Sequence, residues 1–148
     1  MSIPDAPSSV KGPVVQSATG SGIFLPAGNF RTFSFTAQRY ADGTVSGQWV
    51  RVNHPTRTRS EGQVTCFTII ADTVWLGGFA KSGLFTIPDT SDVAWRVADR
   101  GQGSNALPDQ MSLQVVGAPL GFAADYCATT PGIPALLNIE AGNIQVRP

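Results

Sequence analysis

The stretch FRTFSFTAQRYADGTVSGQWVRVNH, residues 30–54, places two strand-like runs on either side of an Asp-Gly pair. In the first run Phe33 and Phe35 alternate with polar residues, which is the period of a half-buried strand. The second run carries Trp49 within a similar alternation of small, apolar and polar residues. Asp-Gly between two such runs is typical of a tight hairpin turn. The stretch therefore predicts an antiparallel β-hairpin that turns at residues 41–44.

Further strand signals continue along the chain on both sides of this hairpin. Runs rich in β-branched and aromatic residues, separated by Gly, Pro or Asp, are typical of short strands. They lie at Val14–Phe24, 63–71, Val74–Ala80, Leu84–Ile87, Asp92–Asp99, Met111–Val116 and Gly142–Arg147. Residues 117–138 show no sustained period and predict an irregular segment. We expect an all-β fold, an antiparallel barrel of about eight short strands. A β-sandwich is the alternative, but the strand–turn–strand connections favour closure of a meander.

The length, the net charge and the apolar runs of the chain limit the classes of function that it can have. The 148 residues fit one domain, which we place at residues 14–148 after a flexible leader at 1–13. Formal net charge is zero, so no global positive field attracts nucleic acid or an anionic membrane. No run approaches the ~18 apolar residues that a membrane-spanning helix needs, and the first residues lack a signal-peptide pattern. We predict neither nucleic-acid binding nor membrane insertion.

Two cysteines, Cys66 and Cys127, are widely separated in the sequence. As a disulfide they would stabilise the fold by roughly 4 kcal/mol in the chain-entropy model. As free thiols they would behave as small buried hydrophobes. The sequence leaves both states open, because spacing alone does not establish a pairing.

The stretch VADRGQGSNALPDQMSLQV, residues 97–115, is a candidate cation loop. Asp99, Asn105 and Asp109 supply oxygen donors. A calcium loop needs such donors at alternate positions, but here two glycines occupy those positions and an arginine follows Asp99 directly. The pattern favours a glycine-rich crossing whose Asp and Asn side chains bind nearby backbone amides. We therefore predict no metal site.

A second candidate is the basic segment RVNHPTRTR at residues 51–59. In an extended segment Arg57 and Arg59 would face one way, with Arg51 and His54 nearby. Guanidinium groups suit carboxylate, phosphate or sulfate, so these four residues are a candidate anion-binding edge. The alternative is a solvated hairpin tip whose arginines keep an edge soluble.

Enzyme signatures are weak. His54 is the sole histidine, it precedes a proline in an expected turn, and the chain has no G-x-S-x-G elbow. One histidine with two distant cysteines is a poor ligand supply for zinc. The chain has neither a phosphate-binding loop of the Walker type nor a dinucleotide fingerprint. We predict no cofactor.

A barrel of this size can also hold one small ligand in its lumen. The aromatic candidates for such a lining are Trp49, Trp75 and Trp95, with Phe33, Phe35, Phe67 and Phe79. The polar candidates that would orient a guest are Arg31, Arg39, Tyr40 and Arg96. Aromatic residues at period two equally predict a packed core, and the sequence does not separate these interpretations.

The second half of the chain resembles a known group of domains. The runs WRVADRGQGSNALPDQMSLQV, ADYCATTP and IEAGNIQVRP are similar to those of bacterial exported β-domains that end in a GGNIQV-type strand. The resemblance extends from about Gly20 to Arg147, although Ala141 stands where the pattern often has glycine. It implies a β fold and export, and it carries over no catalytic residues, since the motifs are structural.

These observations support two hypotheses on function. The first is an extracytoplasmic or secreted, non-catalytic binding or structural interaction module. Its partner would be an apolar or anionic small molecule, or a second copy that pairs through an edge strand. The second is a small barrel enzyme, a cyclase or isomerase, which acts on an apolar molecule in the lumen. An enclosed cavity would favour the second hypothesis, and a filled core or an exposed interaction patch the first.

Overall fold

The computed structural model describes residues 12–82, 91–101 and 106–148. The strands are β1 (Val14–Phe24), β2 (Arg31–Tyr40), β3 (Val45–Asn53), β4 (Thr58–Ile70), β5 (Thr73–Ser82), β6 (Asp92–Ala98), β7 (Gln110–Ser112), β8 (Val115–Ala118), β9 (Leu136–Asn138) and β10 (Ala141–Arg147). A 3-10 turn η1 (Pro26–Gly28) and a helix α2 (Phe122–Thr129) complete the described elements. The predicted all-β class is confirmed. The strand expected at Leu84–Ile87 and most of the expected leader lie outside the described residues.

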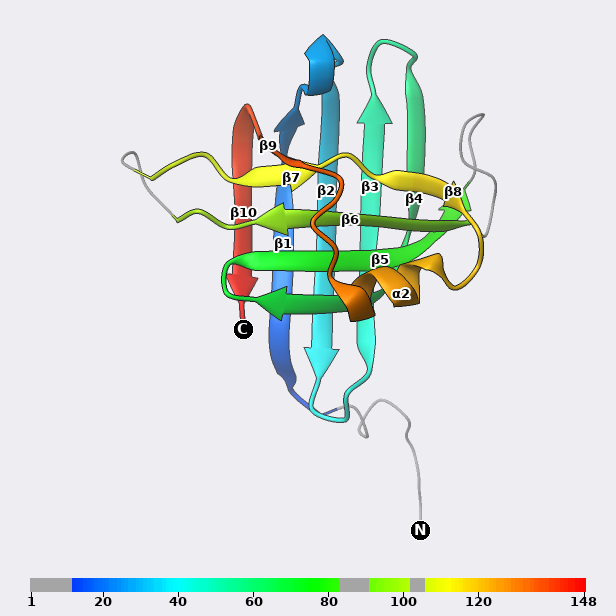
Figure 1. Cartoon of the computed structure of the whole chain (residues 1–148), viewed down its shortest axis with the longest axis vertical. Helices are drawn as coiled ribbons and strands as arrows, with labels where there is room; N and C mark the ends of the chain where they lie inside the picture. The colour runs from blue at the N-terminus through cyan, green and yellow to red at the C-terminus, as the bar shows by residue number, and fades with distance from the viewer. Residues whose placement is uncertain (1–11, 83–90, 102–105) are drawn as a thin grey trace.

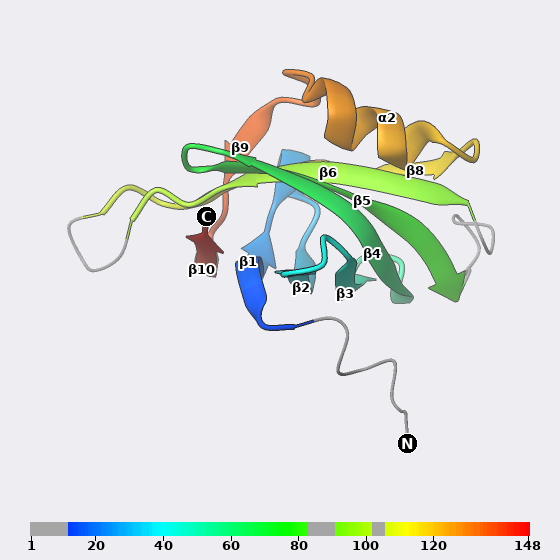
Figure 2. The same cartoon turned by 90° about the horizontal axis from the view of Figure 1, so that it is seen from below.

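The strands form one antiparallel sheet in the order β10-β1-β2-β3-β4-β5-β6-β7-β9, and β8 pairs with β6. The sheet curls into a half-barrel. Its first layer consists of β10, β1, β2, β3 and the beginning of β4. Its second layer consists of the end of β4 with β5, β6, β7, β8 and β9. Figure 1 shows β5, β6 and β7 running across the long strands of the first layer. Figure 2 shows α2 on the outer side of the second layer.

The predicted hairpin at residues 30–54 is confirmed. β2 and β3 pair from Arg39 opposite Val45 to Arg31 opposite Asn53. Thr44 donates its backbone N–H to the side chain of Asp42, at 2.9 Å from Oδ1, which fixes the turn. Because side chains alternate along a strand, every second residue of the pair points to the core. We call this side the inner face of the hairpin.

β4 connects the two layers. Its first half pairs with β3, and its register against β5 shifts between Val64 and Cys66, where one residue is bulged. Such a bulge bends a strand and lets it pass from one layer to the next. Gly62 makes room at this corner, because a Cβ atom there would lie 2.8 Å from Trp49 Nε1. The indole N–H of Trp49 thereby reaches the carbonyl of Phe79 at 3.2 Å.

The space between the layers is filled by aromatic and aliphatic side chains. Trp49 and Trp95 are each 1% exposed, and their rings meet edge to face with centroids 6.2 Å apart. Phe35 contacts Trp95 in the same manner at 6.0 Å. Edge-to-face pairs of this kind add to the free energy of apolar burial. Of the two interpretations of the aromatic residues, the structure thus supports a packed core for these three.

The irregular segment expected at residues 117–138 was a wrong prediction, because it contains the end of β8 and the whole of α2 and β9. The helix buries Ala123, Tyr126 and Cys127 against the second layer. A disulfide joins Cys127 to Cys66 of β4 and settles the pairing that the sequence left open. The carboxylate of Asp92, at the start of β6, accepts the backbone N–H groups of the first turn of α2. The helix is therefore attached to the sheet at both of its ends.

Two carboxylates occupy the outer edge of β10. Asp109 accepts the backbone N–H of Ile144 at 2.6 Å, and Asp99 accepts that of Val146 at 3.1 Å. The other carboxylate oxygens accept the N–H groups of Arg100, at 2.7 Å, and Gly101, at 3.0 Å. The predicted crossing, in which aspartates bind nearby backbone amides, is confirmed for these two residues. Asn105 lies outside the described residues.

Within residues 12–82, 91–101 and 106–148, no helix has the length and hydropathy that crossing a membrane requires.

Candidate functional site

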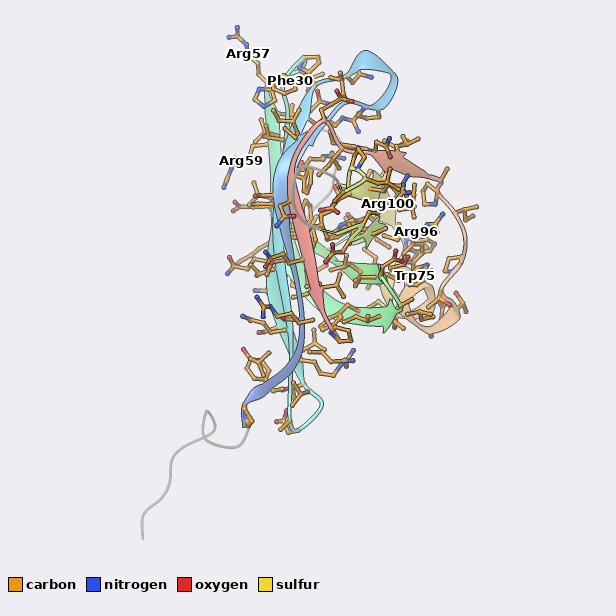
Figure 3. The ribbon with its side chains drawn as sticks, turned by 90° about the vertical axis from the view of Figure 1, so that its left-hand side faces the viewer. Phe30, Arg57, Arg59, Trp75, Arg96 and Arg100 are labelled. Carbon is orange, nitrogen blue, oxygen red and sulfur yellow. A yellow bond between two sulfur atoms is a disulfide. The ribbon has the colours of Figure 1, made fainter. Side chains whose placement is uncertain are left out.

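The side chains predicted to line one lumen are not gathered in one place. Trp49 and Trp95 lie in the core, as described above. Trp75 and Arg96 lie on the outer face of the second layer, and Figure 3 shows both on the side of the molecule away from Arg57. Arg31, Arg39 and Tyr40 belong to β2, outside both of these groups. The predicted set therefore divides into parts with different surroundings.

Trp75 and Arg96 hold the segment that follows α2. Trp75 Nε1 donates to the carbonyl oxygen of Pro131 at 2.7 Å. The guanidinium of Arg96 donates to the carbonyls of Gly132 at 2.8 Å and Pro134 at 3.0 Å. These contacts satisfy backbone groups that would otherwise lie unpaired against the sheet. The two side chains predicted to bind a ligand are thus used by the chain itself.

Tyr126 completes this set of contacts. Its hydroxyl donates to the carbonyl of Ile133, at 3.0 Å, between the two carbonyls that Arg96 holds. Burial raises the pKa of Tyr126, while the positive charge of Arg96 and a hydrogen bond with Ser112 act in the opposite direction. The raised pKa keeps the phenol protonated, so that it remains a donor. We call residues 131–134, held by these three side chains, the strap.

Arg39 lies on the inner face of the hairpin at the end near the turn, which we call the turn end. Its Nε donates to Gln16 Oε1 at 2.8 Å, and one terminal nitrogen donates to the carbonyl of Phe67 at 2.5 Å. The guanidinium also lies over the Phe67 ring, 4.7 Å from its centroid. Its neighbour Tyr40 hydrogen-bonds Ser46 at 3.0 Å. Arg39 therefore serves as a structural cation in this arrangement.

The opposite end of the inner face, where β2 begins and β3 ends, carries Arg31 and Arg51. We call it the distal end. The register sets Arg31 against Asn53 and Arg51 against Phe33, so the two arginines lie diagonally across adjacent strands. Nε of both guanidiniums and Oδ1 of Asn53 are buried and have no hydrogen-bond partner in the part of the chain that the structure describes. Burial, and secondly the positive charge of Arg31, lower the pKa of Arg51. Sequence reasoning had assigned these two arginines to different sites.

The predicted anion-binding edge is not one surface. Arg51 points to the inner face, whereas Arg57 lies in the turn before β4 with a left-handed φ of 57°. That turn removes the extended backbone on which the prediction for Arg57 and Arg59 depended. Arg59 forms an exposed ion pair with Glu61 at 2.5 Å. Figure 3 shows Arg57 and Arg59 projecting from the outside of the molecule.

His54 is also at the distal end but is committed to its own neighbours. Its ring stacks on Phe30, with centroids 4.4 Å apart, and its Nε2 lies 3.3 Å from Thr32 Oγ1. The distal end therefore has an exposed outer part, formed by Phe30 and His54, and an inner part formed by the two arginines.

The outer face of the first layer bears mostly short, uncharged polar side chains. Two neighbouring open hollows, of about 410 and 360 Å³, lie on it and share Thr36 and Gln48. The polar side chains that line them are Thr19, Ser21, Ser34, Thr36, Gln38, Ser46, Gln48, Gln63, Thr65, Asn143 and Gln145. We call this set the polar face. No α-helix in the described part of the chain covers it, since α2 lies on the second layer (Figure 2).

Comparison of the chain with protein-family models, curated proteins and solved structures found no match.

Proposed function

We propose that this chain is an extracytoplasmic, non-catalytic binding module that holds a neutral glycan on the polar face. The observation that carries the proposal is the chemistry of that face. Its hydroxyl and amide side chains each contain both a donor and an acceptor. Sugar hydroxyls have the same double character, so an uncharged glycan matches the face group by group.

The placement of charge supports the same ligand class. The side chains that define the polar face are all uncharged. Arg59 and Glu61, on the same strand β4 as Gln63 and Thr65 of the polar face, neutralise each other in an ion pair. A charged partner would meet no charged side chain among those that line the two hollows, whereas a neutral one avoids the cost of desolvating an unpaired ion. An exposed β-sheet surface with adjacent hollows also suits an extended chain better than a compact molecule.

The proposed compartment is supported by the Cys66–Cys127 disulfide, because such bonds persist mainly in oxidising environments. The resemblance to bacterial exported β-domains points the same way and stays a prediction.

The alternative, a cyclase or isomerase with its substrate in the lumen, needs an interior cavity. In that interior the ring of Trp95 contacts the rings of both Phe35 and Trp49. No observation on the described residues favours this alternative.

Affinity electrophoresis through gels that contain soluble neutral polysaccharides tests the proposal. We expect at least one such polysaccharide to retard the protein. T36E places a carboxylate in both hollows and is expected to weaken binding about tenfold, equivalent to ~1.4 kcal/mol. L107E adds the same charge at a residue that is 59% exposed and outside the polar face, and serves as the control. Migration unaffected by every neutral polysaccharide, or equal losses in both variants, would refute the proposal.

A further inference from the structure

The distal end of the hairpin holds two cations that the described fold does not balance. Arg31 and Arg51 come from adjacent strands and point to the same inner face. Their interaction is repulsive, since each lies within the field of the other. The ion pair found among the described residues joins Arg59 to Glu61, and neither Arg31 nor Arg51 takes part in it.

Hydrogen bonding at this end is equally incomplete. Nε of each guanidinium is buried, and neither has an acceptor within the described part of the chain. A buried donor without an acceptor is costly, more so when it is charged. The side-chain amide oxygen Oδ1 of Asn53, the residue directly opposite Arg31, is a buried acceptor without a donor among the described residues. Two donors and one acceptor are thus unsatisfied within two pairs of the β2–β3 register that follow one another on the inner face.

Three other arrangements in the same molecule show that this is not a general property of its charged side chains. Arg39 and Arg96 each hydrogen-bond through Nε and through a terminal nitrogen. Asp109 is 5% exposed and accepts two backbone N–H groups. Two other buried atoms in the described part of the chain also lack a hydrogen-bond partner, Trp95 Nε1 and Gln114 Oε1, but both belong to uncharged side chains. The charged donors without an acceptor lie at the distal end, and together with Asn53 Oδ1 they indicate the chemistry of a missing partner.

We infer that the distal end binds a small oxyanion that carries an O–H group next to its charge. The oxyanion would accept hydrogen bonds from Arg31 and Arg51, whose planar forks suit paired oxygens. The adjacent O–H would donate to Asn53 Oδ1. A hydroxylated carboxylate and a protonated phosphate share this chemistry. The site is on the inner side of the first layer and does not depend on the polar face.

Thermal unfolding in the presence of four sodium salts at equal ionic strength tests this inference. Glucuronate and inorganic phosphate carry both the oxyanion and an O–H group, acetate lacks the O–H, and chloride lacks both. A ligand that binds only the folded state raises the Tm. We expect glucuronate or phosphate to raise the Tm by several degrees, acetate to do so less, and chloride not at all. Whichever of the first two acts at the lower concentration identifies the source of the oxyanion.

Variants separate the site from general salt effects. R51M removes one guanidinium and is expected to abolish the Tm increase, whereas R59M makes the same charge change at an exposed position and should retain it. N53D is nearly isosteric and supplies a carboxylate beside Arg31. It should raise the Tm without any ligand and remove the response to glucuronate and phosphate.

Two results would overturn the inference. The first is that R51M and the unmodified protein respond alike to all four salts. The second is that N53D lowers the Tm, because the two cations would then have no need of a negative partner. Circular dichroism of each variant at low temperature verifies that the comparison is made between folded proteins.

Discussion

The two ends of one hairpin face handle positive charge in opposite ways. At the turn end, Arg39 is held by Gln16, by the carbonyl of Phe67 and by the Phe67 ring. At the distal end, Arg31 and Arg51 share the same inner face with neither hydrogen bonds nor a counter-ion among the described residues. The residue type and the face of the hairpin are the same in both cases. Only the neighbours that the fold brings to each end differ.

This difference separates an arginine that maintains the fold from arginines available for a ligand. The guanidinium of Arg39 donates to two acceptors of the fold, and its removal would leave both of them unpaired. Arg31 and Arg51 repel each other in the protein without a ligand, so removal of one of them should not lower the free energy of unfolding. Stability measurements on matched variants therefore discriminate between the two roles without knowledge of the ligand.

The largest effect is expected from the disulfide beside the turn end. Cys66, Cys127 and Arg39 line the same open hollow, and the bond closes a loop with a sequence separation of 61. The double variant C66A/C127A should lose about 4 kcal/mol of unfolding free energy in the chain-entropy model. Urea denaturation measures this loss, and dithiothreitol should destabilise the unmodified protein but not the double variant. A loss below ~1 kcal/mol would show that α2 and the strap hold the second layer without it.

Both carboxylate oxygens of Asp109 accept hydrogen bonds, so its replacement measures how much a buried and fully hydrogen-bonded charge adds to the free energy of unfolding. D109N replaces one acceptor oxygen by an N–H₂ group, which would face the backbone N–H of Arg100 or Ile144. We expect a loss of about 3 kcal/mol, since hydrogen bonds to charged groups are the strong class. E140Q makes the same exchange at an exposed side chain and should change the stability by less than ~0.5 kcal/mol. Equal effects of the two variants would contradict the role assigned to Asp109.

Replacement of Arg39 directly tests the difference between the turn end and the distal end. R39M keeps most of the apolar stem but loses both hydrogen bonds and the contact with the Phe67 ring. Because Arg39 is only partly buried, we expect a moderate loss of about 2 kcal/mol. Chemical denaturation of R39M beside R59M gives the measurement, with R59M close to the unmodified protein. An R39M protein of unchanged stability would remove the distinction between the two ends.

The smallest effect, with the opposite sign, is expected from Arg51. R51M removes one of two mutually repelling charges and one unsatisfied buried donor. Without added anion the unfolding free energy should stay the same or rise by up to about 1 kcal/mol. A denaturation midpoint in chloride-only buffer measures it. If R51M were destabilised as strongly as R39M, both ends would have to be regarded as structural.

The sequence predicted the hairpin, its turn and most strands, because alternation at period two and Asp-Gly chemistry are local signals. The placement of Arg31 and Arg51 on one face could also have been predicted from the sequence. Phe33 and Phe35 define the inner parity of the first strand and thus place Arg31 there, as Trp49 does for Arg51. Grouping the arginines by closeness in sequence, as in Arg51 with Arg57 and Arg59, concealed this cross-strand relation.

Other features had no local signal of sufficient length. Helix α2 has eight residues, and its buried positions Ala123, Tyr126 and Cys127 show helical spacing over hardly more than one turn. The roles of Trp75 and Arg96 depend on carbonyl groups 56 and 36–38 residues further along the chain. Contacts of such range are decided by how the layers pack, so period and composition at either residue could not reveal them.

The carboxylates on β10 have a consequence for the behaviour of the protein in crowded solution. A half-barrel ends in strands whose outward N–H and C=O groups can template the addition of a foreign strand, which is how fibrils and edge-to-edge aggregates grow. On β10 the amides of Ile144 and Val146 are already taken by Asp109 and Asp99. An incoming strand would have to displace two negatively charged acceptors in order to pair with these two amides. The side chains of Asp99 and Asp109 thus protect this edge of the sheet against the addition of further strands.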